Sequence, residues 1–185
     1  RAEDEGGLLF QLEQDLTLEL QRLRRDLYFL HSAALAVPEG AVLFVGDSGA
    51  GKSTLAWGLL HHGFEYLSDE LAPIAAQELR VLPYPRALCL KAPPPEAYAL
   101  PPAVVHTSRG LHVPTGGPGC AVLRARRLHA IFFLEPGAVE RRLPTVRPMS
   151  TAEAAARLLA NALNPLAHAA DGLDAALAIA QCAPC

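Results

Sequence analysis

Gly46-Asp47-Ser48-Gly49-Ala50-Gly51-Lys52-Ser53-Thr54 is the stretch from which the rest of this sequence can be interpreted. It fits G-x-x-x-x-G-K-[ST] at every fixed position, the pattern of loops that bind nucleoside triphosphates. The run 41–45 before it is short, apolar and strand-like, and the run 52–60 after it is rich in helix formers and reaches Gly63, a suitable helix end. This context favours a phosphate-binding loop over a glycine-rich turn that matches by accident.

Each part of this loop has an expected role. Its glycines allow successive backbone N–H groups to point at phosphate oxygens, and the following helix N-terminus adds partial positive charge. Lys52 is expected to reach the β- and γ-phosphates, and the Ser53 hydroxyl is expected to ligate Mg²⁺. The sequence therefore predicts a site for a nucleoside triphosphate with Mg²⁺, with all nine residues 46–54 contributing to it.

Composition sets limits on the remaining possibilities. The chain has 185 residues, 51% of them hydrophobic, which predicts one domain, 1–185, with a buried core. Its net charge of −3 provides no basic field for nucleic acid, and the basic clusters at 22–25 and 124–127 are typical of solvated surfaces. No apolar run approaches the ~20 residues that span a bilayer. Four cysteines do not make a disulfide scaffold. We expect a cytoplasmic protein without a membrane partner, whose natural chain continues beyond residue 185.

Upstream of the loop, the sequence predicts a helix and then a hairpin. The segment 8–10 is expected to begin a strand. Leucines at 16, 20, 23 and 27 recur at helical spacing and predict an amphipathic helix packed on a sheet. The run 28–37 is strand-like and the turn 38–40 follows it, so 41–45 should return antiparallel. A hairpin that leads into the loop indicates an α/β fold with a mixed β-sheet.

Two acidic residues follow the next expected strand. The strand 64–68 ends at Asp69 and Glu70. At this place, carboxylates can hold Mg²⁺ or accept the proton of an incoming hydroxyl. A polar turn or a helix cap is the alternative explanation. The spacing favours the functional one.

These residues together resemble the catalytic domain of HPr kinase/phosphorylase. That family has a histidine before the loop, a GDSGxGKS-type loop, and a Gly-x-x-x-x-x-Asp-Asp segment after the helix. The sequence is most similar to the HPr kinase-related kinases, including the lasso-peptide kinases, over residues 28 to 165. The shared runs are Leu30-His31-Ser32-Ala33, Leu67-Ser68-Asp69-Glu70 and Pro83-Tyr84-Pro85-Arg86-Ala87-Leu88-Cys89-Leu90-Lys91.

The resemblance implies a mixed-sheet fold like the nucleotide-binding domain of phosphoenolpyruvate carboxykinase. It also implies ATP-dependent phosphorylation of a serine or threonine hydroxyl in a protein or peptide. By motif position, Asp69 matches the acid that activates the hydroxyl, Glu70 the second acid near Mg²⁺, and His31 the histidine that supports Asp69. Glu70 replaces an aspartate of the family, and the family's basic, glycine-containing signature is not recognisable here. The resemblance therefore carries over neither the reverse phosphorolysis nor HPr as substrate.

The middle of the chain predicts a hairpin within 71–81, a strand at 88–90 and a loop-rich insert at about 92–120. Such an insert beside a nucleotide site can serve as a lid or a substrate platform. Arg86 and Lys91 are candidates to contact phosphates or acidic groups of the acceptor, although an exposed structural role fits each of them equally. His106 and His112 lack partners at metal spacing and are interpreted as polar loop residues.

The last third of the chain predicts elements that cover the core. We expect strands at 128–134 and 139–146, and a helix capped by Ser150 that ends near 164. A final helix should begin at Asp171 or Gly172, with its apolar face formed by Leu173, Ala176, Leu177 and Ala180. Cys182 and Cys185 form a lone C-x-x-C, which is weak evidence for zinc or redox chemistry.

Three functions remain open at this point. The first is a kinase acting on a protein or peptide hydroxyl, and the second is a kinase for a small-molecule hydroxyl. The third is an ATPase or nucleotide-gated switch in which an acid positions water, but the run 64–68 is too polar for the buried strand of an ATPase motor. HPr kinases form hexamers, and the apolar helix faces here would tolerate contacts in a homo-oligomer.

Overall fold

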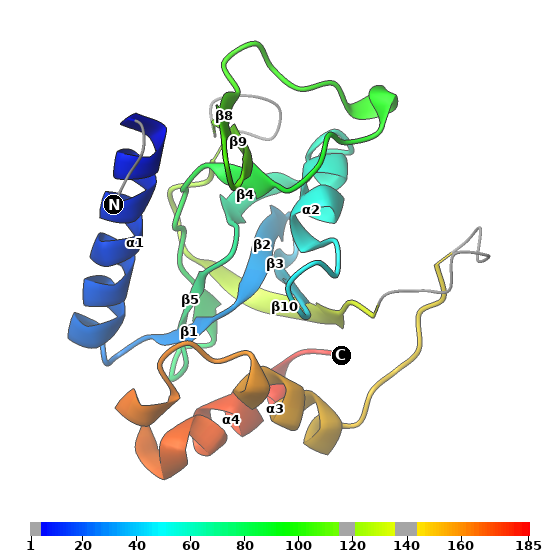
Figure 1. The fold of residues 1–185 in the computed structure, drawn as a ribbon. Helices are drawn as coiled ribbons and strands as arrows, with labels where there is room; N and C mark the ends of the chain where they lie inside the picture. Colours follow the sequence, from blue (N-terminus) through cyan, green and yellow to red (C-terminus); the bar gives the residue numbers. More distant parts are fainter. Residues whose placement is uncertain (1–4, 115–120, 136–143) are drawn as a thin grey trace.

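The computed structural model describes residues 5–114, 121–135 and 144–185 (Figure 1). These residues form an α/β protein with a mixed seven-stranded sheet and a separate three-stranded sheet. The α-helices are α1 (Glu5–Leu23), α2 (Lys52–Leu60), α3 (Thr151–Ala160) and α4 (Leu173–Cys182). The strands of the large sheet are β1 (Tyr28–Leu30), β2 (Ser32–Val37), β3 (Gly40–Val45), β4 (Glu65–Ser68), β5 (Ala72–Ala75), β6 (Arg80–Val81) and β10 (Arg126–Phe133).

The large sheet has the strand order β1-β5-β6-β10-β3-β2-β4. Strand β3 lies between β10, to which it is parallel, and β2, to which it is antiparallel. The predicted mixed sheet and the predicted β2–β3 hairpin are therefore confirmed. The hairpin turn needs glycine at position 40, because a Cβ atom there would lie 2.4 Å from the Arg127 carbonyl oxygen. This central hairpin carries the chain into the glycine-rich loop.

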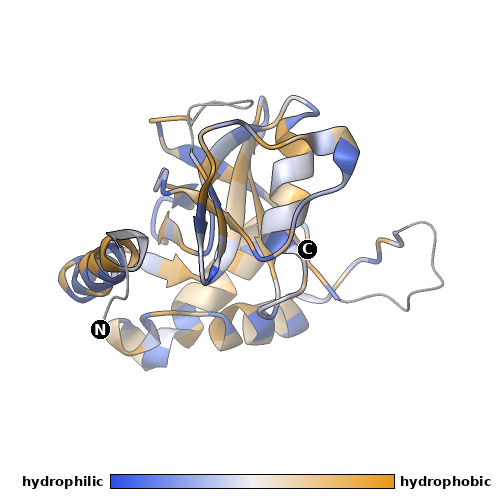
Figure 2. Ribbon diagram, turned by 45° about the horizontal axis from the view of Figure 1, so that its top comes forward, coloured by the Kyte–Doolittle hydropathy of each residue, from blue (hydrophilic) through white to orange (hydrophobic). Residues whose placement is uncertain are grey.

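Helices cover both faces of the sheet. On one face, α2 packs Ala56, Trp57 and Leu60 against Val42 and Phe44 of β3. On the other face, α3 and α4 pack against a core that includes the intervening residues of β3. Successive side chains of a strand point to opposite faces, so a strand covered on both sides is apolar throughout. Figure 2 shows the apolar residues concentrated in the sheet between its helices.

The N-terminal segment differs from its prediction. Residues 8–10, expected as a strand, belong to α1. The helix is present, but Leu16 and Leu23, expected to pack on the sheet, have 62% and 77% of their surface exposed. The leucine spacing indicates an apolar face without indicating which way that face points. Residues 28–37 form two strands because the chain bends at His31, which directs β1 to β5 and β2 to β3 and β4.

The segment 92–120 contains more regular structure than expected. It holds the 3₁₀ helix η1 (Glu96–Tyr98) and a hairpin of β8 (Val105–Thr107) and β9 (Gly110–Val113). Strand β9 pairs with β7 (Leu88–Leu90) to complete the small sheet. The predicted strand at 88–90 and the predicted 71–81 hairpin, formed by β5 and β6, are confirmed. Residues 115–120 of this segment lie outside the described residues.

The C-terminal elements follow the prediction in outline. The Ser150 hydroxyl accepts a hydrogen bond from the Glu153 N–H (3.2 Å), which confirms the cap, but α3 ends earlier than expected, at Ala160. The 3₁₀ helices η2 (Pro165–Ala167) and η3 (Ala169–Gly172) join it to α4. Leu173 and Leu177 were expected in the core and are 47% and 39% exposed.

The strand expected at 139–146 is wrong for 144–146, which have no regular structure, while 139–143 lie outside the described residues. Among the described helices, none combines the length and the apolar character needed to cross a membrane.

Candidate functional site

The glycine-rich loop 46–51 connects the end of β3 to the start of α2. Gly49 and Gly51 both have φ of +91°, in the left-handed region that other residues rarely adopt. A Cβ atom at either position would meet nothing within 4 Å, so glycine is needed there for its backbone conformation and not for space. Gly51 is the N-cap of α2 and offers no side chain to the first helical N–H groups. The first N–H groups of α2 are therefore suited to donate hydrogen bonds to a bound anion.

Lys52 is buried beside this loop, with 6% of its surface exposed. Its Nζ donates to the carbonyl oxygens of Gly46 (2.6 Å) and Asp47 (3.0 Å). Burial lowers the pKa of the Lys52 ammonium, and the nearby carboxylates of Asp69 and Glu70 oppose that shift. The lysine thus brings positive charge to the inner side of the loop.

Asp69 lies directly after β4 and is fully buried. One carboxylate oxygen accepts a hydrogen bond from the Ser53 hydroxyl and the other from the Cys89 N–H, each at 3.1 Å. Burial raises the pKa of Asp69 to about 6, although both of these hydrogen bonds favour its ionised form. Asp69 therefore joins the first turn of α2 to strand β7.

Glu70, the residue after Asp69, has a strained backbone and a carboxylate that lies beside Arg86. Its φ is +62°, a left-handed conformation that is costly for a residue with a side chain. Its carboxylate lies 3.6 Å from Arg86, whose other terminal nitrogen donates to Glu13 of α1 (3.1 Å). Arg86 was a candidate for contacts with phosphates or the acceptor. In this structure its guanidinium is engaged by two carboxylates of the chain itself.

Lys91 and His31 complete the cluster. The Nζ of Lys91 donates to the Ser48 hydroxyl of the loop (2.7 Å). His31 is half-buried at the bend between β1 and β2, and not within a strand as its motif suggests. Burial is the main cause that lowers the pKa of His31, and the positive charge of Lys52 lowers it further. Within the described residues no hydrogen bond joins His31 to Asp69.

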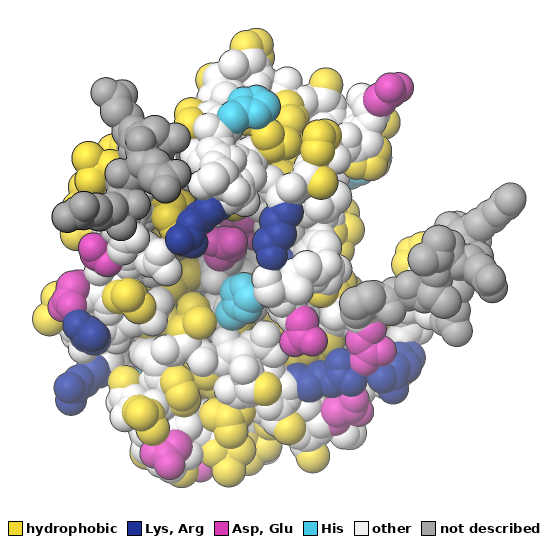
Figure 3. All heavy atoms as spheres, viewed as in Figure 1, with side chains coloured by type: hydrophobic (Ala, Val, Ile, Leu, Met, Phe, Trp, Pro, Cys, Tyr) yellow, Lys and Arg dark blue, Asp and Glu magenta, His cyan; other side chains and the backbone are white. Residues whose placement is uncertain are grey.

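The cluster thus brings together residues far apart in the sequence. The sequence predicted eight of its side chains, namely His31, Ser48, Lys52, Ser53, Asp69, Glu70, Arg86 and Lys91. It missed Glu13 and the backbone N–H of Cys89, because no local pattern links them to the site. Figure 3 shows acidic and basic side chains close together near the middle of this face, with a histidine nearby.

The two loop histidines lie outside this cluster, on the small sheet. His106 is on β8, and His112 is on β9, where its Nε2 lies 3.0 Å from the Thr107 hydroxyl. In the part of the chain that the structure describes, no three His, Cys, Asp or Glu side chains form a group able to hold a metal ion by themselves.

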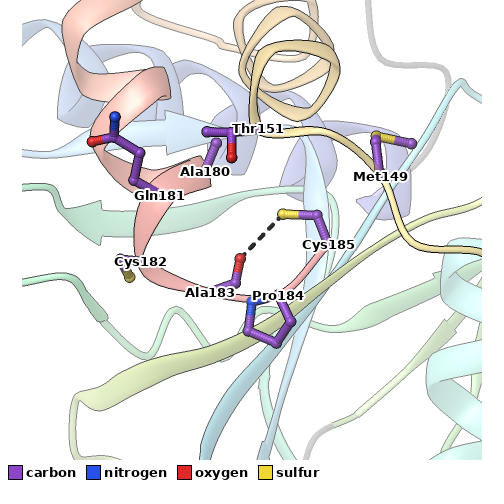
Figure 4. A pocket seen from close by; sticks show the side chains of 8 residues that line it. All are labelled: Met149, Thr151, Ala180, Gln181, Cys182, Ala183, Pro184 and Cys185. Carbon is purple, nitrogen blue, oxygen red and sulfur yellow. Dashed lines mark hydrogen bonds between the residues drawn. The ribbon is translucent and has the colours of Figure 1, made fainter.

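A pocket of about 360 Å³ lies elsewhere, at the C-terminal C-x-x-C. It is lined by Met149, Thr151, Ala180, Gln181, Cys182, Ala183, Pro184 and Cys185 (Figure 4). The Cys185 thiol donates to the Ala183 carbonyl (3.3 Å), and Figure 4 shows the sulfur atoms of the two cysteines directed to different sides. Burial raises the pKa of both thiols, which makes them poorer nucleophiles and ligands.

Neither a model of a protein family nor a curated protein sequence matches this chain. The function proposed below therefore rests on the glycine-rich loop, the buried Lys52 and Asp69, and the residues around them.

Proposed function

We propose that this chain is an ATP-dependent kinase that transfers the γ-phosphoryl group to a serine or threonine-type hydroxyl of a protein or peptide. One observation carries the proposal: the buried Asp69 carboxylate is hydrogen-bonded to Ser53 in the first turn of α2, directly after the glycine-rich loop. A nucleotide bound at the loop would have its terminal phosphate close to a carboxylate able to accept a proton. This juxtaposition is what phosphoryl transfer to a hydroxyl requires.

The residues present fit a triphosphate with Mg²⁺. The start of α2 and the Lys52 ammonium offer positive charge, and the two loop carbonyls now bonded to Lys52 are weaker partners than phosphate oxygens. The Ser53 hydroxyl and the Glu70 carboxylate would hold Mg²⁺, whose other ligands would be phosphate oxygens and water. Such an ion would supply positive charge against the charge that develops on the transferred phosphoryl group.

Asp69 is the residue that we propose as general base. A pKa of about 6 leaves its carboxylate ionised at neutral pH, while keeping it more basic than an exposed aspartate. A base is most effective when its pKa lies near the working pH. The charge of Glu70 acts on the pKa of His31, and no hydrogen bond in the described residues joins His31 to Asp69. We therefore propose that His31 acts on the acidic pair through electrostatics.

The fold and setting are proposed on the same basis. The mixed sheet and the hairpin that leads into the loop agree with a fold like those of HPr kinase and phosphoenolpyruvate carboxykinase. A net charge of −3 favours a protein or peptide acceptor over nucleic acid. We propose a cytoplasmic enzyme.

An ATPase or nucleotide-gated switch is the second candidate, and the state of Arg86 favours it. This cation is already paired with Glu13 and Glu70, so it is not free to attract an acidic acceptor. In a switch, Asp69 would orient water in place of an acceptor hydroxyl.

ATP turnover with and without a library of hydroxyl-bearing peptides tests the proposal. A kinase should leave a phosphate on a peptide, detectable by mass spectrometry, and should turn over little ATP without one. Lys52→Ala should lower transfer by about 10²–10³-fold, because it removes a preorganised charge at the developing phosphate. Arg124→Ala, at an exposed arginine away from the loop, is the matched control. Equal ATP hydrolysis with and without peptides would favour the switch, and full transfer by a folded Lys52→Ala protein would exclude the site.

A further inference from the structure

Glu13 is the residue through which α1 reaches the charged cluster at the loop. Its carboxylate accepts a hydrogen bond from one terminal nitrogen of Arg86 at 3.1 Å. The other terminal nitrogen of Arg86 lies 3.6 Å from the Glu70 carboxylate, which is longer than a hydrogen bond. Two carboxylates therefore share one guanidinium, and Glu13 holds it more closely than Glu70 does.

Glu13 is held in this position by contacts one helical turn before it and one turn after it. The ring of Phe10 lies under the guanidinium of Arg109, 4.3 Å from the ring centroid. The Thr17 hydroxyl is hydrogen-bonded to the Tyr84 hydroxyl at 2.7 Å. Spacings of three and four residues place all three α1 positions on the same side of the helix. The helix thus presents Glu13 to the cluster from a fixed place.

Arg86 is held beside Glu70 by its backbone. Its carbonyl oxygen accepts a hydrogen bond from the hydroxyl of the buried Tyr66 (2.9 Å), and its N–H donates to the Tyr84 carbonyl (2.8 Å). The side chain is only 10% exposed, and its Nε has no hydrogen-bond partner among the described residues. Arg86 therefore has a donor to spare for Glu70 and stays near it.

The partner that Arg86 takes matters to Glu70, because a guanidinium and Mg²⁺ compete for the same carboxylate. A guanidinium can bond both oxygens of a carboxylate at once. Mg²⁺ gives up its water reluctantly and takes few protein ligands, so a carboxylate engaged in that way is a poor ligand for it. With Arg86 held by Glu13, the Glu70 side chain stays 36% exposed and keeps oxygen lone pairs available. Glu13 also offsets the positive charge of Arg86, which repels a cation.

We propose that Glu13 is a positioning residue for the Mg²⁺ site: it holds Arg86 away from Glu70 and so leaves Glu70 free to bind the Mg²⁺ of a bound nucleotide. The docking of α1 thereby sets the Mg²⁺ concentration at which the nucleotide is bound. The inference rests on the function proposed above in one respect, the assignment of Glu70 to Mg²⁺. It applies equally to a kinase and to a nucleotide-gated switch.

Equilibrium binding of a non-hydrolysable ATP analogue to the full chain, titrated with Mg²⁺, tests the proposal without turnover. Glu13→Gln should raise the Mg²⁺ concentration at half-saturation at least about threefold, because Arg86 then pairs with Glu70. Binding of the analogue without Mg²⁺ should not weaken, whereas damage to the fold would weaken both. Glu19→Gln, at an exposed residue of the same helix that is paired with Arg22, is the matched control and should behave as wild type.

A second substitution shows whether Glu13 acts through Arg86. In an Arg86→Met background, Glu13→Gln should no longer change the Mg²⁺ requirement, because no cation remains to be held away from Glu70. A wild-type Mg²⁺ requirement in Glu13→Gln would overturn the inference. The same increase with and without Arg86 would overturn it as well, since Glu13 would then act only as a nearby negative charge.

Glu70→Gln separates a failure of this inference from a failure of the proposed metal ligand. In the Glu70→Gln background, Glu13→Gln should have no further effect, and this comparison also decides the case if Arg86→Met does not fold. If Glu70→Gln raises the Mg²⁺ requirement and Glu13→Gln does not, only the role of Glu13 is wrong. If Glu70→Gln leaves the requirement unchanged, Glu70 is not a Mg²⁺ ligand and both assignments are overturned.

Discussion

The glycine-rich loop and the C-terminal pocket differ in what they bury. Around the loop, Lys52 and Asp69 are ionisable groups removed almost completely from water. The pocket at Cys182 and Cys185 is an open hollow of about 360 Å³, and no charged side chain lines it. Burying a charge is costly, whereas a surface hollow lined by uncharged side chains costs little. The buried charges are therefore the stronger sign of a functional site, and the volume of a cavity is the weaker one.

The largest expected effect is at Asp69. Asp69→Asn keeps the shape of the side chain and removes its basicity, so transfer to an acceptor should fall by about 10²–10⁴-fold while ATP affinity changes little. Single-turnover transfer and equilibrium nucleotide binding measure the two quantities. Asp174→Asn, on an exposed part of α4, is the control. Near-normal transfer by Asp69→Asn would mean that the buried carboxylate at the loop is no better a sign of function than the uncharged C-terminal pocket. Glu70 would then become the candidate base.

The burial of Asp69 should also make stability depend on pH. Its pKa is about 6 in the folded protein against an ordinary value of 3.8, so the folded state binds more protons between these values. Stability should therefore fall as pH rises from about 4 to about 6, by roughly 3 kcal/mol, and stay lower above that range. Urea unfolding of wild type and Asp69→Asn, without nucleotide or Mg²⁺, isolates this contribution. Parallel pH profiles of the two proteins would show that the pKa of Asp69 is not raised in the folded state.

A smaller change is expected at Glu70. Glu70→Gln should raise the Mg²⁺ concentration needed for half-maximal turnover several-fold, because an amide oxygen is a weaker ligand than a carboxylate. Titration of Mg²⁺ at saturating ATP measures this shift, with the exposed Glu78→Gln as control. The same Mg²⁺ requirement in both variants would limit the role of Glu70 to its contact with Arg86.

The smallest effect is expected in the pocket. Replacing both cysteines, Cys182→Ser/Cys185→Ser, should leave turnover within about twofold, since both thiols are protonated at neutral pH and neither joins the charged cluster. Steady-state assays under reducing and oxidising conditions test this. A large loss of activity would mean that the pocket takes part in function despite its lack of charge.

The part of the site that could be predicted is the part encoded locally. The loop, the strand before it and the acidic pair after β4 are each defined by neighbours in sequence. The hairpin into the loop was predictable as well, from the turn at 38–40. The pairing of Arg86 with Glu13 was not, because 73 residues separate them and α1 could have packed on either face. The hairpin β8–β9 was hidden by the prolines and glycines around it, and the bend at His31 by the lack of a glycine or proline.

The backbone at Glu70 has a consequence for the engineering of this protein. A residue with a side chain in the left-handed region costs on the order of 1–3 kcal/mol, and glycine would relieve that cost. A selection for thermal tolerance should therefore enrich Glu70→Gly, which also discards the carboxylate proposed to serve Mg²⁺. Directed evolution for heat resistance would then yield robust proteins that need a higher Mg²⁺ concentration to turn over ATP. Libraries meant to keep activity should hold this position fixed.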